Sequence, residues 1–411
     1  MSSPRVVVTG LGVLTPIGLT VADFWTNLTA GRSGVRPITR FDTARYPFKL
    51  AAEVDGFDPL KYLDVKTASR MSRYSQLAVA AASMAAQMAN LDMKTEQPER
   101  VGVVVATIGQ VRAIHELTAS LEKPVPTRVD PLFIHKTGPN MAAAQVGRHL
   151  GARGPNSSVN SACASGSDAL GAAFNLIRLG QADVMIAGGA DDTVGPVSIL
   201  TMGIIGTVSK ATEPGTVPKP FDLNRDGIVV GEGAGMLVLE TEGHARQRGA
   251  PILAELAGAG WSFDAYNEVA PDPEGEALAI KAALGNARVR PEDIQYVNAH
   301  GTGTRLNDTA ETKAIKLALG DHARKVAVSS NKSIMGHLSC GAGAVEAAAS
   351  ILTIVNGIIP PTINYRTPDP ECDLDYVPNT ARKAPIDTVL KNGFGLGGQN
   401  CCLIFRRLGN G

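Results

Sequence analysis

The sequence predicts an α/β fold built from two similar halves. In residues 158–190, short apolar runs bounded by glycine alternate with a helix of small residues, which is typical of a sheet covered on both faces. The alternation begins again at Ile252, after the segment 243–251. Each half also contains one helix rich in Gly and Ala, CASGSDALGAAFNLI and CGAGAVEAAASILTI. Small residues let helix backbones approach closely, so both helices are expected at the centre of a layered fold.

An internal duplication accounts for these observations, with a first half at 1–251 and a second half at 252–411. The alternative is a chance likeness in an alanine-rich chain, because no residue-by-residue repeat of fixed period is visible.

The elements of the first half follow from β-branched runs for strands and from capped helical periods for helices. The run RVVVTGLG at 5–12 is a predicted buried strand, and the helix after it ends at Gly31. Further strands are predicted at 101–107, 158–160, 182–190 and 234–240, and further helices within 61–91, 131–150 and 165–179. Of these strands, 101–107 and 158–160 are expected to be buried within the sheet.

The second half repeats the alternation. Strands are predicted at 252–260 and 294–300, and helices at 274–287 and 309–319. Asp308 precedes the latter helix and is predicted to cap it. A strand, a loop and the second Gly- and Ala-rich helix follow within 326–352.

Composition excludes several classes of protein. The chain has 411 residues, 44% hydrophobic and 19% charged, with Lys plus Arg equal to Asp plus Glu at 39 each. This balance gives no reason to expect nucleic acid or a membrane surface as a partner. The N-terminus lacks a signal-peptide layout and no apolar run is long enough to span a membrane, so a cytoplasmic protein is expected. The cysteines, which form no CxxC motif and predict neither disulfides nor a structural zinc site, are Cys163, Cys340, Cys372, Cys401 and Cys402.

Cys163 lies where a strand pattern gives way to a helix pattern, in SVNSACASGSDALG. The unpaired amide groups and dipole of a helix N-terminus favour an anion, so the pKa of this thiol is predicted to fall and the thiolate to act as a nucleophile. The alternative is a buried and inert cysteine, the more frequent case for a single Cys.

Two histidines share the layout of Cys163. His300 ends a predicted strand and precedes GTGTRLND, and His337 lies in NKSIMGHLSCGAG after another strand. A single histidine is more often a satisfied structural residue. Here three residues each stand after a strand, among glycines and before a helix, so all three are expected to converge at one edge of the sheet.

The chain resembles the β-ketoacyl-acyl carrier protein synthases of the type that elongates fatty acids, often called synthase II, over essentially its full length. The matching motifs are VVVTGLGVLTPIG, SACASG, PFDLNRDGIVVGEGAGMLVLE, VNAHGTGT, SSNKSIMGHLSCGAGAVE, IPPTINY and GFGLGGQNCCLIF. The resemblance implies a thiolase-like fold, in which two duplicated α/β halves form five layers, αβαβα. It also implies a homodimer.

The resemblance assigns roles to the candidate residues. Cys163 takes an acyl chain from the phosphopantetheine thioester of acyl carrier protein, and a carrier-bound malonyl group then loses carbon dioxide and attacks it. His300 and His337 stabilise the enolate that decarboxylation leaves. Lys332 and Glu346 match the supporting polar pair of the family, although a purely structural ion pair is an equal alternative for Lys332. No metal and no cofactor beyond the carrier's phosphopantetheine is implied.

Further positions follow from the same motifs. The backbone amides of Cys163 and Leu396 are expected to form an oxyanion hole, with Phe394 beside the gate. Supporting roles are expected for Asp308, Thr302 and Thr304. Lys66 and Arg70 match positions that receive the carrier protein, and with Arg73 they are predicted to share a cationic surface. The alternative for these three cations is an ordinary solvated helix face.

Some positions depart from the family. Leu396 stands where Phe usually gates the cysteine, Gly393 where Ser is usual, and Gly206 where an Arg helps to receive the carrier. These departures suggest a specialised enzyme, so a polyketide-type ketosynthase is kept as an alternative. A catalytically silent partner subunit is less favoured, because the chain keeps the nucleophile and both histidines. A biosynthetic thiolase would need a second catalytic cysteine, and Cys401 lies beyond the glycine turn.

Overall fold

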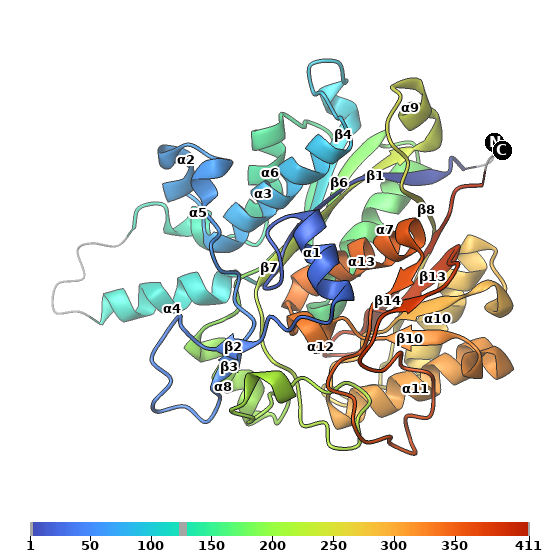
Figure 1. Cartoon of the computed structure of the whole chain (residues 1–411). Coiled ribbons are helices and arrows are strands. Elements are labelled where there is room, and N and C mark those ends of the chain that lie inside the picture. The colour runs from blue at the N-terminus through green and yellow to red at the C-terminus, as the bar shows by residue number, and fades with distance from the viewer. Residues whose placement is uncertain (1–2, 123–129, 410–411) are drawn as a thin grey trace.

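The computed structural model describes residues 3–122 and 130–409, and both halves are built from strands and helices (Figure 1). The helices and strands of the first half are β1 (Val6–Leu14), α1 (Val21–Thr29), β2 (Arg36–Pro37), β3 (Leu50–Ala51), α2 (Val65–Ser69), α3 (Arg73–Met88), β4 (Val101–Ala106), α4 (Gln110–Leu121), α5 (Phe133–Thr137), α6 (Met141–Leu150), β5 (Asn156–Val159), α7 (Ser165–Arg178), β6 (Val184–Asp191), α8 (Pro196–Ile204), β7 (Gly233–Thr241) and α9 (Glu242–Gln247). Those of the second half are β8 (Ala254–Phe263), α10 (Pro273–Ala287), β9 (Tyr296–Asn298), α11 (Arg305–Leu319), β10 (Ala327–Ser329), α12 (Lys332–Met335), α13 (Ala342–Asn356), β11 (Ile358–Ile359), β12 (Arg382–Lys383), β13 (Thr388–Lys391) and β14 (Gln399–Arg406).

The two halves have the same sheet topology. The first half orders its main strands β5-β4-β6-β7-β1, and the second orders its own β10-β9-β13-β14-β8. In each half the first three strands of that order are parallel and the last two pair antiparallel. Identical order and direction confirm the predicted duplication.

Backbone hydrogen bonds join the two half-sheets at their first strands. β1 pairs antiparallel with β8, with Val6 opposite Leu256 and Val8 opposite Ala254, so the strands form one continuous ten-stranded sheet. This sheet bends around the central helices, so the molecule still stacks as five layers. The predicted boundary between residues 251 and 252 falls just before β8 and stays a prediction.

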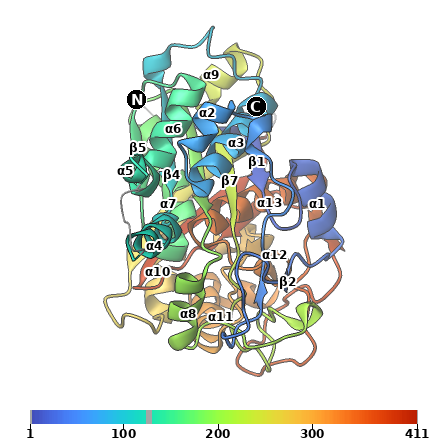
Figure 2. The same cartoon turned by 90° about the vertical axis from the view of Figure 1, so that its left-hand side faces the viewer.

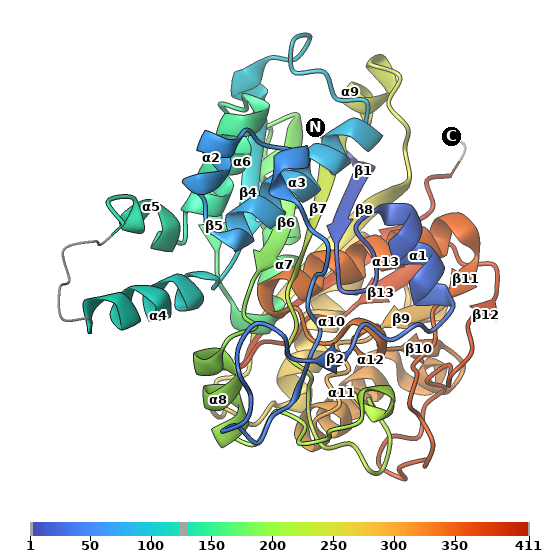
Figure 3. The same ribbon diagram turned by 60° about the vertical axis from the view of Figure 1, so that its left-hand side comes forward.

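The layers are visible as a stack in all three views (Figures 1, 2 and 3). Helices α3 and α6 cover the outer face of the first half-sheet, and α10 and α11 cover that of the second. Helices α7 and α13 lie between the two half-sheets and contact both. The predicted αβαβα fold is therefore confirmed.

Small residues set the spacing of the central layer. A Cβ added at Gly166 of α7 would lie 2.6 Å from the carbonyl oxygen of Cys340, and one at Gly343 of α13 would lie 2.5 Å from the backbone nitrogen of Ser167. Glycine at these positions is what lets the two helices start side by side. The stretch Ser339–Asn356, which contains α13, has the length and apolar composition of a membrane span, but 83% of it is buried inside the protein. Its apolarity reflects its place in the core.

One local prediction was wrong, and two helical segments are divided more finely than the sequence shows. Residues 158–160 were predicted as a buried strand, whereas β5 is an edge strand with exposed or half-buried residues, because it pairs only with β4. The pattern at 131–150 divides into α5 and α6, and that at 61–91 into α2 and α3. In both places a short helix precedes the long one, which a single period in the sequence does not separate.

Candidate active site

Cys163 lies in a tight turn that connects β5 to α7. The turn is a 3-10 helix at Ala162–Ala164, and Ala162 has a φ of +50°, a left-handed conformation that is strained for a residue with a Cβ. Two hydrogen bonds through Ser165 hold it: the Ser161 backbone N–H donates to Ser165 Oγ at 2.8 Å, and that hydroxyl donates to the Ala162 carbonyl at 2.6 Å. The strained turn leaves Cys163 half-buried just before the helix begins.

The predicted fall in the pKa of Cys163 is wrong. Burial raises the pKa of this thiol, and the Lys332 charge and the backbone N–H of Leu396 offset the rise only in part. The sequence argument considered the helix N-terminus alone, and desolvation of the thiolate outweighs that effect. The thiol is therefore mainly protonated at neutral pH, and nucleophilic attack requires the loss of this proton.

His300 is held by a buried carboxylate and a buried lysine. Glu311 of α11 accepts from the backbone N–H groups of His300 and Gly301, both at 2.7 Å, and so fixes the loop after β9. Lys332 Nζ donates to the His300 carbonyl at 2.7 Å and lies 3.4 Å from His300 Nδ1. Because the ammonium group has no lone pair, Nδ1 is the acceptor and the imidazole proton lies on Nε2.

His337 has the same tautomer for a different reason. The backbone N–H of Ser339 donates to His337 Nδ1 at 3.1 Å, which again leaves the proton on Nε2. Within residues 3–122 and 130–409, His337 Nε2 has no hydrogen-bond partner. Burial, followed by the Lys332 charge, lowers the pKa of both His300 and His337 well below its usual range. Both rings are neutral at physiological pH and can each donate one Nε2–H.

The structure brings the three predicted residues together. One sulfur or ring-nitrogen atom from each of Cys163, His300 and His337 lies within 4.8 Å of the others. The two imidazole rings are 5.7 Å apart between centroids and nearly perpendicular, and Phe394 packs against His300 at 5.9 Å. A cysteine and two neutral donors thus face a common point, and the roles predicted for them require this arrangement.

Lys332 and Glu346 form a buried ion pair beside the histidines. Lys332 Nζ donates to Glu346 Oε1 at 2.5 Å, and both side chains are 1% exposed. With its two contacts to His300, this bond accounts for all three ammonium hydrogens. The pair therefore orients His300 whether or not it takes part in the chemistry.

The turn at 395–398 lies against the cysteine turn. A Cβ at Gly395 would lie 2.4 Å from the Ser161 carbonyl oxygen, and Gly397 and Gly398 have φ of +97° and +85°. Glycine is required for this close approach. The effect of the Leu396 N–H on the pKa of Cys163 places that amide beside the sulfur, where an oxyanion donor is needed. The Leu396 side chain is 47% exposed.

A cavity of about 390 Å³ leads from Cys163 to the surface. Its walls include His300, His337, Phe394, Leu396, Thr302 and Thr304. The two threonine hydroxyls hydrogen-bond each other at 2.8 Å. Thr304, not Asp308 as predicted, is the N-cap of α11, because the helix begins at Arg305. Asp308 instead lies buried in the first turn, where it accepts from the backbone N–H groups of Phe221 and Gly303.

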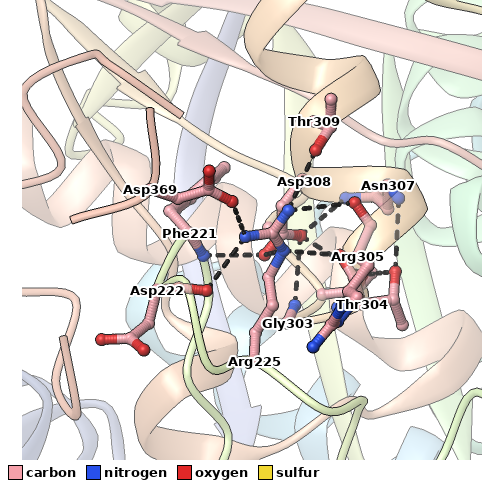
Figure 4. A network of polar contacts seen from close by, with 12 residues as sticks. Phe221, Asp222, Arg225, Gly303, Thr304, Arg305, Asn307, Asp308, Thr309 and Asp369 are labelled. Carbon is pink, nitrogen blue, oxygen red and sulfur yellow. Dashed lines mark hydrogen bonds and ion pairs between the residues drawn. The ribbon is translucent and has the colours of Figure 1, made fainter. Parts of the chain in front are cut away.

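Arg225 fixes the cavity wall that carries the two threonines (Figure 4). The side chain is 3% exposed and projects from the PFDLNRDG motif. Its guanidinium N–H groups donate to the carbonyls of Asp222, Thr304 and Arg305, to Thr309 Oγ1 and to Asp369 Oδ2. Every guanidinium hydrogen is used, so Arg225 ties three separate segments into one rigid wall.

The three cations predicted to share one surface do not all lie on it. Lys66 and Arg70 are exposed on and just after α2, but neither lines the cavity. Arg73 does not share their surface, because its guanidinium turns inward to Glu232 at 2.9 Å. Arg305 is exposed at the cavity wall. Gly206 also lines the cavity, and its φ of +78° favours glycine over the Arg expected there.

Sequence reasoning missed three buried residues that shape the site: Glu311, Arg225 and Lys391. The sequence predicts a helix around Glu311 and a loop around Arg225, and it predicts no element at Lys391. Charged residues at positions that the pattern buries were the available signal, since buried charges need a partner.

Comparisons with known proteins agree with this geometry. The model of the beta-ketoacyl synthase N-terminal domain matches residues 3–245, and that of the C-terminal domain matches residues 253–366. A 3-oxoacyl-[acyl-carrier-protein] synthase 2 from Synechocystis sp. is 43% identical over 411 residues, covering 99% of each chain. The protein of that name from Coxiella burnetii is 42% identical over 412 residues, covering 99% of this chain and 100% of the other.

Solved ketosynthase structures are also similar to this chain over nearly its whole length. The ishigamide ketosynthase/chain length factor has a TM-score of 0.94 and 37% identity, covering 99% of this chain and 100% of that chain. A type II polyketide synthase acyl-carrier protein in complex with its ketosynthase, bound to the hexaketide, has a TM-score of 0.92, 35% identity and the same coverage. A beta-ketoacyl synthase from Burkholderia phymatum has a TM-score of 0.90 and 35% identity, again with that coverage.

Proposed function

The chain belongs to the beta-ketoacyl synthase family, and we propose that its site joins an acyl group on Cys163 to a malonyl group carried by acyl carrier protein. The enzyme is an acyltransferase of the condensing type, and the product is a 3-oxoacyl-acyl carrier protein. One observation carries the proposal for the site: two neutral histidines, whose protons lie on Nε2, each have a ring nitrogen within 4.8 Å of the cysteine sulfur.

The first step transfers the acyl group. Cys163 Sγ attacks the thioester carbonyl, the carbon–sulfur bond to phosphopantetheine breaks, and the thiol proton ends on the departing phosphopantetheine sulfur. The tetrahedral intermediate places its oxygen at the amides of Cys163 and Leu396. Phe394 and Leu396 stand beside this point as wall and gate.

The second step forms the carbon–carbon bond. The malonyl carboxylate leaves as carbon dioxide, and its bonding electron pair becomes an enolate on the thioester. His300 and His337 donate their Nε2–H groups to the enolate oxygen. These hydrogen bonds are stronger in the transition state than in the substrate, because the negative charge develops only there. The enolate carbon then attacks the acyl carbonyl, the bond from that carbonyl to Cys163 Sγ breaks, and the departing thiolate takes up a proton from solvent.

The cavity fits a phosphopantetheine arm. Thr302 and Thr304 supply hydroxyl groups along its wall, which match the amide groups of such an arm. Lys66 and Arg70 are proposed to attract the acidic carrier protein, together with Arg305, which is exposed and lines the cavity.

A homodimer is proposed from the surface of the first half. β5 has an unpaired edge, and α4 and α5 extend away from the layers (Figures 1 and 3). Ile114, Leu121 and Ile134 on and near these helices are 47%, 50% and 78% exposed. An exposed edge strand next to apolar side chains is typical of a strand-pairing interface between two copies.

The proposed location is cytoplasmic, as the sequence predicts.

The pathway is assigned to fatty acid chain elongation, because the curated relatives are named 3-oxoacyl-[acyl-carrier-protein] synthase 2. A polyketide-type ketosynthase is the second candidate. It is favoured by the similar ketosynthase that was solved with a type II polyketide synthase acyl-carrier protein and by the smaller gate at Leu396.

The test is intact-mass analysis of the purified enzyme after incubation with a panel of acyl-acyl carrier proteins. We expect one acyl adduct, on Cys163, that disappears when malonyl-acyl carrier protein is added and 3-oxoacyl product forms. The accepted acyl chains distinguish saturated fatty acids from polyketide intermediates. The same reaction with a chelator tests the metal-free prediction, and full activity is expected. Absence of any Cys163 adduct across the panel contradicts the proposal.

A further inference from the structure

Lys391 is a second buried lysine beside the site, and the reaction steps above do not use it. It is the last residue of β13 and is fully buried. Its Nζ donates to Ser167 Oγ of α7 at 2.7 Å and lies 3.2 Å from Glu346 Oε2. A buried ammonium group is costly unless it is paired, so a lysine here needs an explanation.

Glu346 stands between two lysines. Lys332 donates to its Oε1 at 2.5 Å, and Lys391 faces its Oε2 at 3.2 Å. The three side chains are each 1% exposed. Two ammonium groups and one carboxylate leave an excess of one positive charge next to His300, which Lys332 contacts directly.

The backbone leaves space for this second lysine. A Cβ added at Gly393 would lie 2.7 Å from Ser167 Oγ and 3.2 Å from Lys391 Nζ, with the Cys401 carbonyl oxygen at 2.9 Å. A serine at position 393, which the family resemblance predicts, would push on the atoms that hold Lys391. Gly393 and Lys391 are therefore two parts of one feature.

We propose that Lys391 is a positioning residue for the condensation step: it pairs with the second oxygen of Glu346, so that Lys332 stays fixed against His300, and its charge favours the negative enolate. This role rests on the proposed function. The same atoms would otherwise form only a structural tie between β13, α7 and α13.

The electrostatics of both histidines support this role. After burial and Lys332, Lys391 is a further cause that lowers the pKa of His300 and of His337. Protonation at Nδ1 would place a donor against Lys332 Nζ in one ring and against the Ser339 N–H in the other, and would turn both rings away. Each ring therefore functions only while neutral, and a nearby cation extends that range to lower pH.

The groups around Lys391 are few. Glu346 faces it from α13, Lys332 from α12, Ser167 from α7, and the thiols of Cys401 and Cys402 from β14. Burial lowers the pKa of Lys391 itself, and Glu346 raises it in partial compensation. Loss of the Lys391 charge leaves Glu346 paired with Lys332 alone, so the site keeps its fold and loses its excess charge.

The experiment compares the full-length enzyme with Lys391→Met and with Lys281→Met, which removes an exposed lysine of α10. For Lys391→Met we expect malonyl-acyl carrier protein decarboxylation to fall about 10-fold at pH 7, and its acid limb to move about one unit to higher pH. Acyl-Cys163 formation should stay within a few-fold of the parent. Lys281→Met should change neither.

A second readout needs no substrate. Imidazole NMR titration of His300 and His337 should show a higher pKa in Lys391→Met than in the parent enzyme. Lys391→Gln, which removes the charge but keeps a hydrogen-bond donor for Ser167 Oγ, replaces Met if that variant does not fold. A folded variant with unchanged histidine titration and an unchanged pH profile overturns the role of Lys391. A parent enzyme that does not decarboxylate malonyl groups contradicts the proposed function instead, and the titration still tests Lys391.

Discussion

The two central helices begin in the same way, yet they present two different cysteines. α7 follows a 3-10 turn at Ala162–Ala164 that contains Cys163, and α13 follows one at Ser339–Gly341 that contains Cys340. The residue before each cysteine has a left-handed φ, +50° at Ala162 and +53° at Ser339. The duplication has therefore placed a cysteine at the same position of the same strained turn in both halves.

Their surroundings differ. Cys340 is fully buried, its backbone N–H donates to Asp191 at 2.7 Å, and burial together with that carboxylate raises its pKa well above the usual range. Cys163 opens into the cavity, beside the Leu396 N–H and near Lys332. In the second half, residues 330–338 lengthen the connection before the turn and supply Lys332 and His337. A turn at a helix start is thus not enough to make a nucleophile; access and neighbouring donors decide.

The largest expected difference is between the two cysteines. Cys163→Ala should abolish acyl-enzyme formation and lower condensation by about 10³-fold or more, because the attacking atom is lost. Cys340→Ala should still be acylated on Cys163. Intact-mass analysis of both variants with acyl-acyl carrier protein measures this. An adduct on Cys340, or none in Cys340→Ala enzyme that is folded, would contradict the distinction.

Next in size is the effect of the histidines that only the second half supplies. His300→Ala or His337→Ala should lower condensation by about 10²-fold to 10³-fold, the cost of one preorganised donor. Formation of acyl-Cys163 should remain measurable, since the oxyanion amides are intact. Single-turnover assays of the two half-reactions separate these outcomes. Loss of acylation with intact decarboxylation would reverse the assigned roles.

Helices α7 and α13 approach each other closely at their first residues, so an added side chain on either helix should lower stability. Gly166→Ala and Gly343→Ala should each lower the free energy of unfolding by about 1–3 kcal/mol, because the added Cβ meets backbone of the other helix. Gly285→Ala is the matched control: it lies exposed in α10 with nothing within 4 Å of the added Cβ. That variant should be about 0.5–1 kcal/mol more stable. Denaturant unfolding measures the free energy of unfolding of the three variants. Equal changes in all three would contradict the packing argument.

The reactivity of the two thiols, Cys163 and Cys340, can also be compared in the unmutated enzyme. Since burial raises the pKa of Cys163, its thiolate fraction at pH 7 is small and grows as the pH rises towards that pKa. Alkylation of Cys163 by iodoacetamide should accelerate by about 10-fold per pH unit from pH 7 to 8. Cys340 should remain unmodified over this range. A rate at Cys163 that is already constant at pH 7 would restore the lowered pKa that the sequence predicts.

The smallest expected effect concerns the access of acyl groups to Cys163. Leu396 lines the cavity and is 47% exposed, so Leu396→Phe places a larger, flat side chain in front of Cys163. We expect a few-fold loss for bulky or branched acyl groups, little change for short straight ones, and slower malonyl decarboxylation in the absence of acyl donor. Competition assays with paired acyl-carrier substrates measure the ratio. An unchanged acyl profile and an unchanged decarboxylation rate would show that Leu396 is a neutral repacking.

Local patterns in the sequence determine the layered fold and the positions of three site residues. The alternation of strands and helices, the Gly- and Ala-rich central helices and the position of Cys163, His300 and His337 after strands all follow from short-range periodicity and glycine placement. These signals predict the layered fold and three residues that the fold brings together. The ordered motifs then identify the family, and the comparisons confirm it.

Only the tertiary structure decided the electrostatics of the site. Whether a helix start lowers a thiol pKa depends on how much water the fold removes, and at Cys163 burial outweighs the helix. No local pattern predicts the partners of Asp308, Glu311, Arg225 and Lys391, because each has a partner far along the chain. A local pattern records which side chains are present, but the pairing of buried charges is a property of distant segments, so it appears only when the chain is folded.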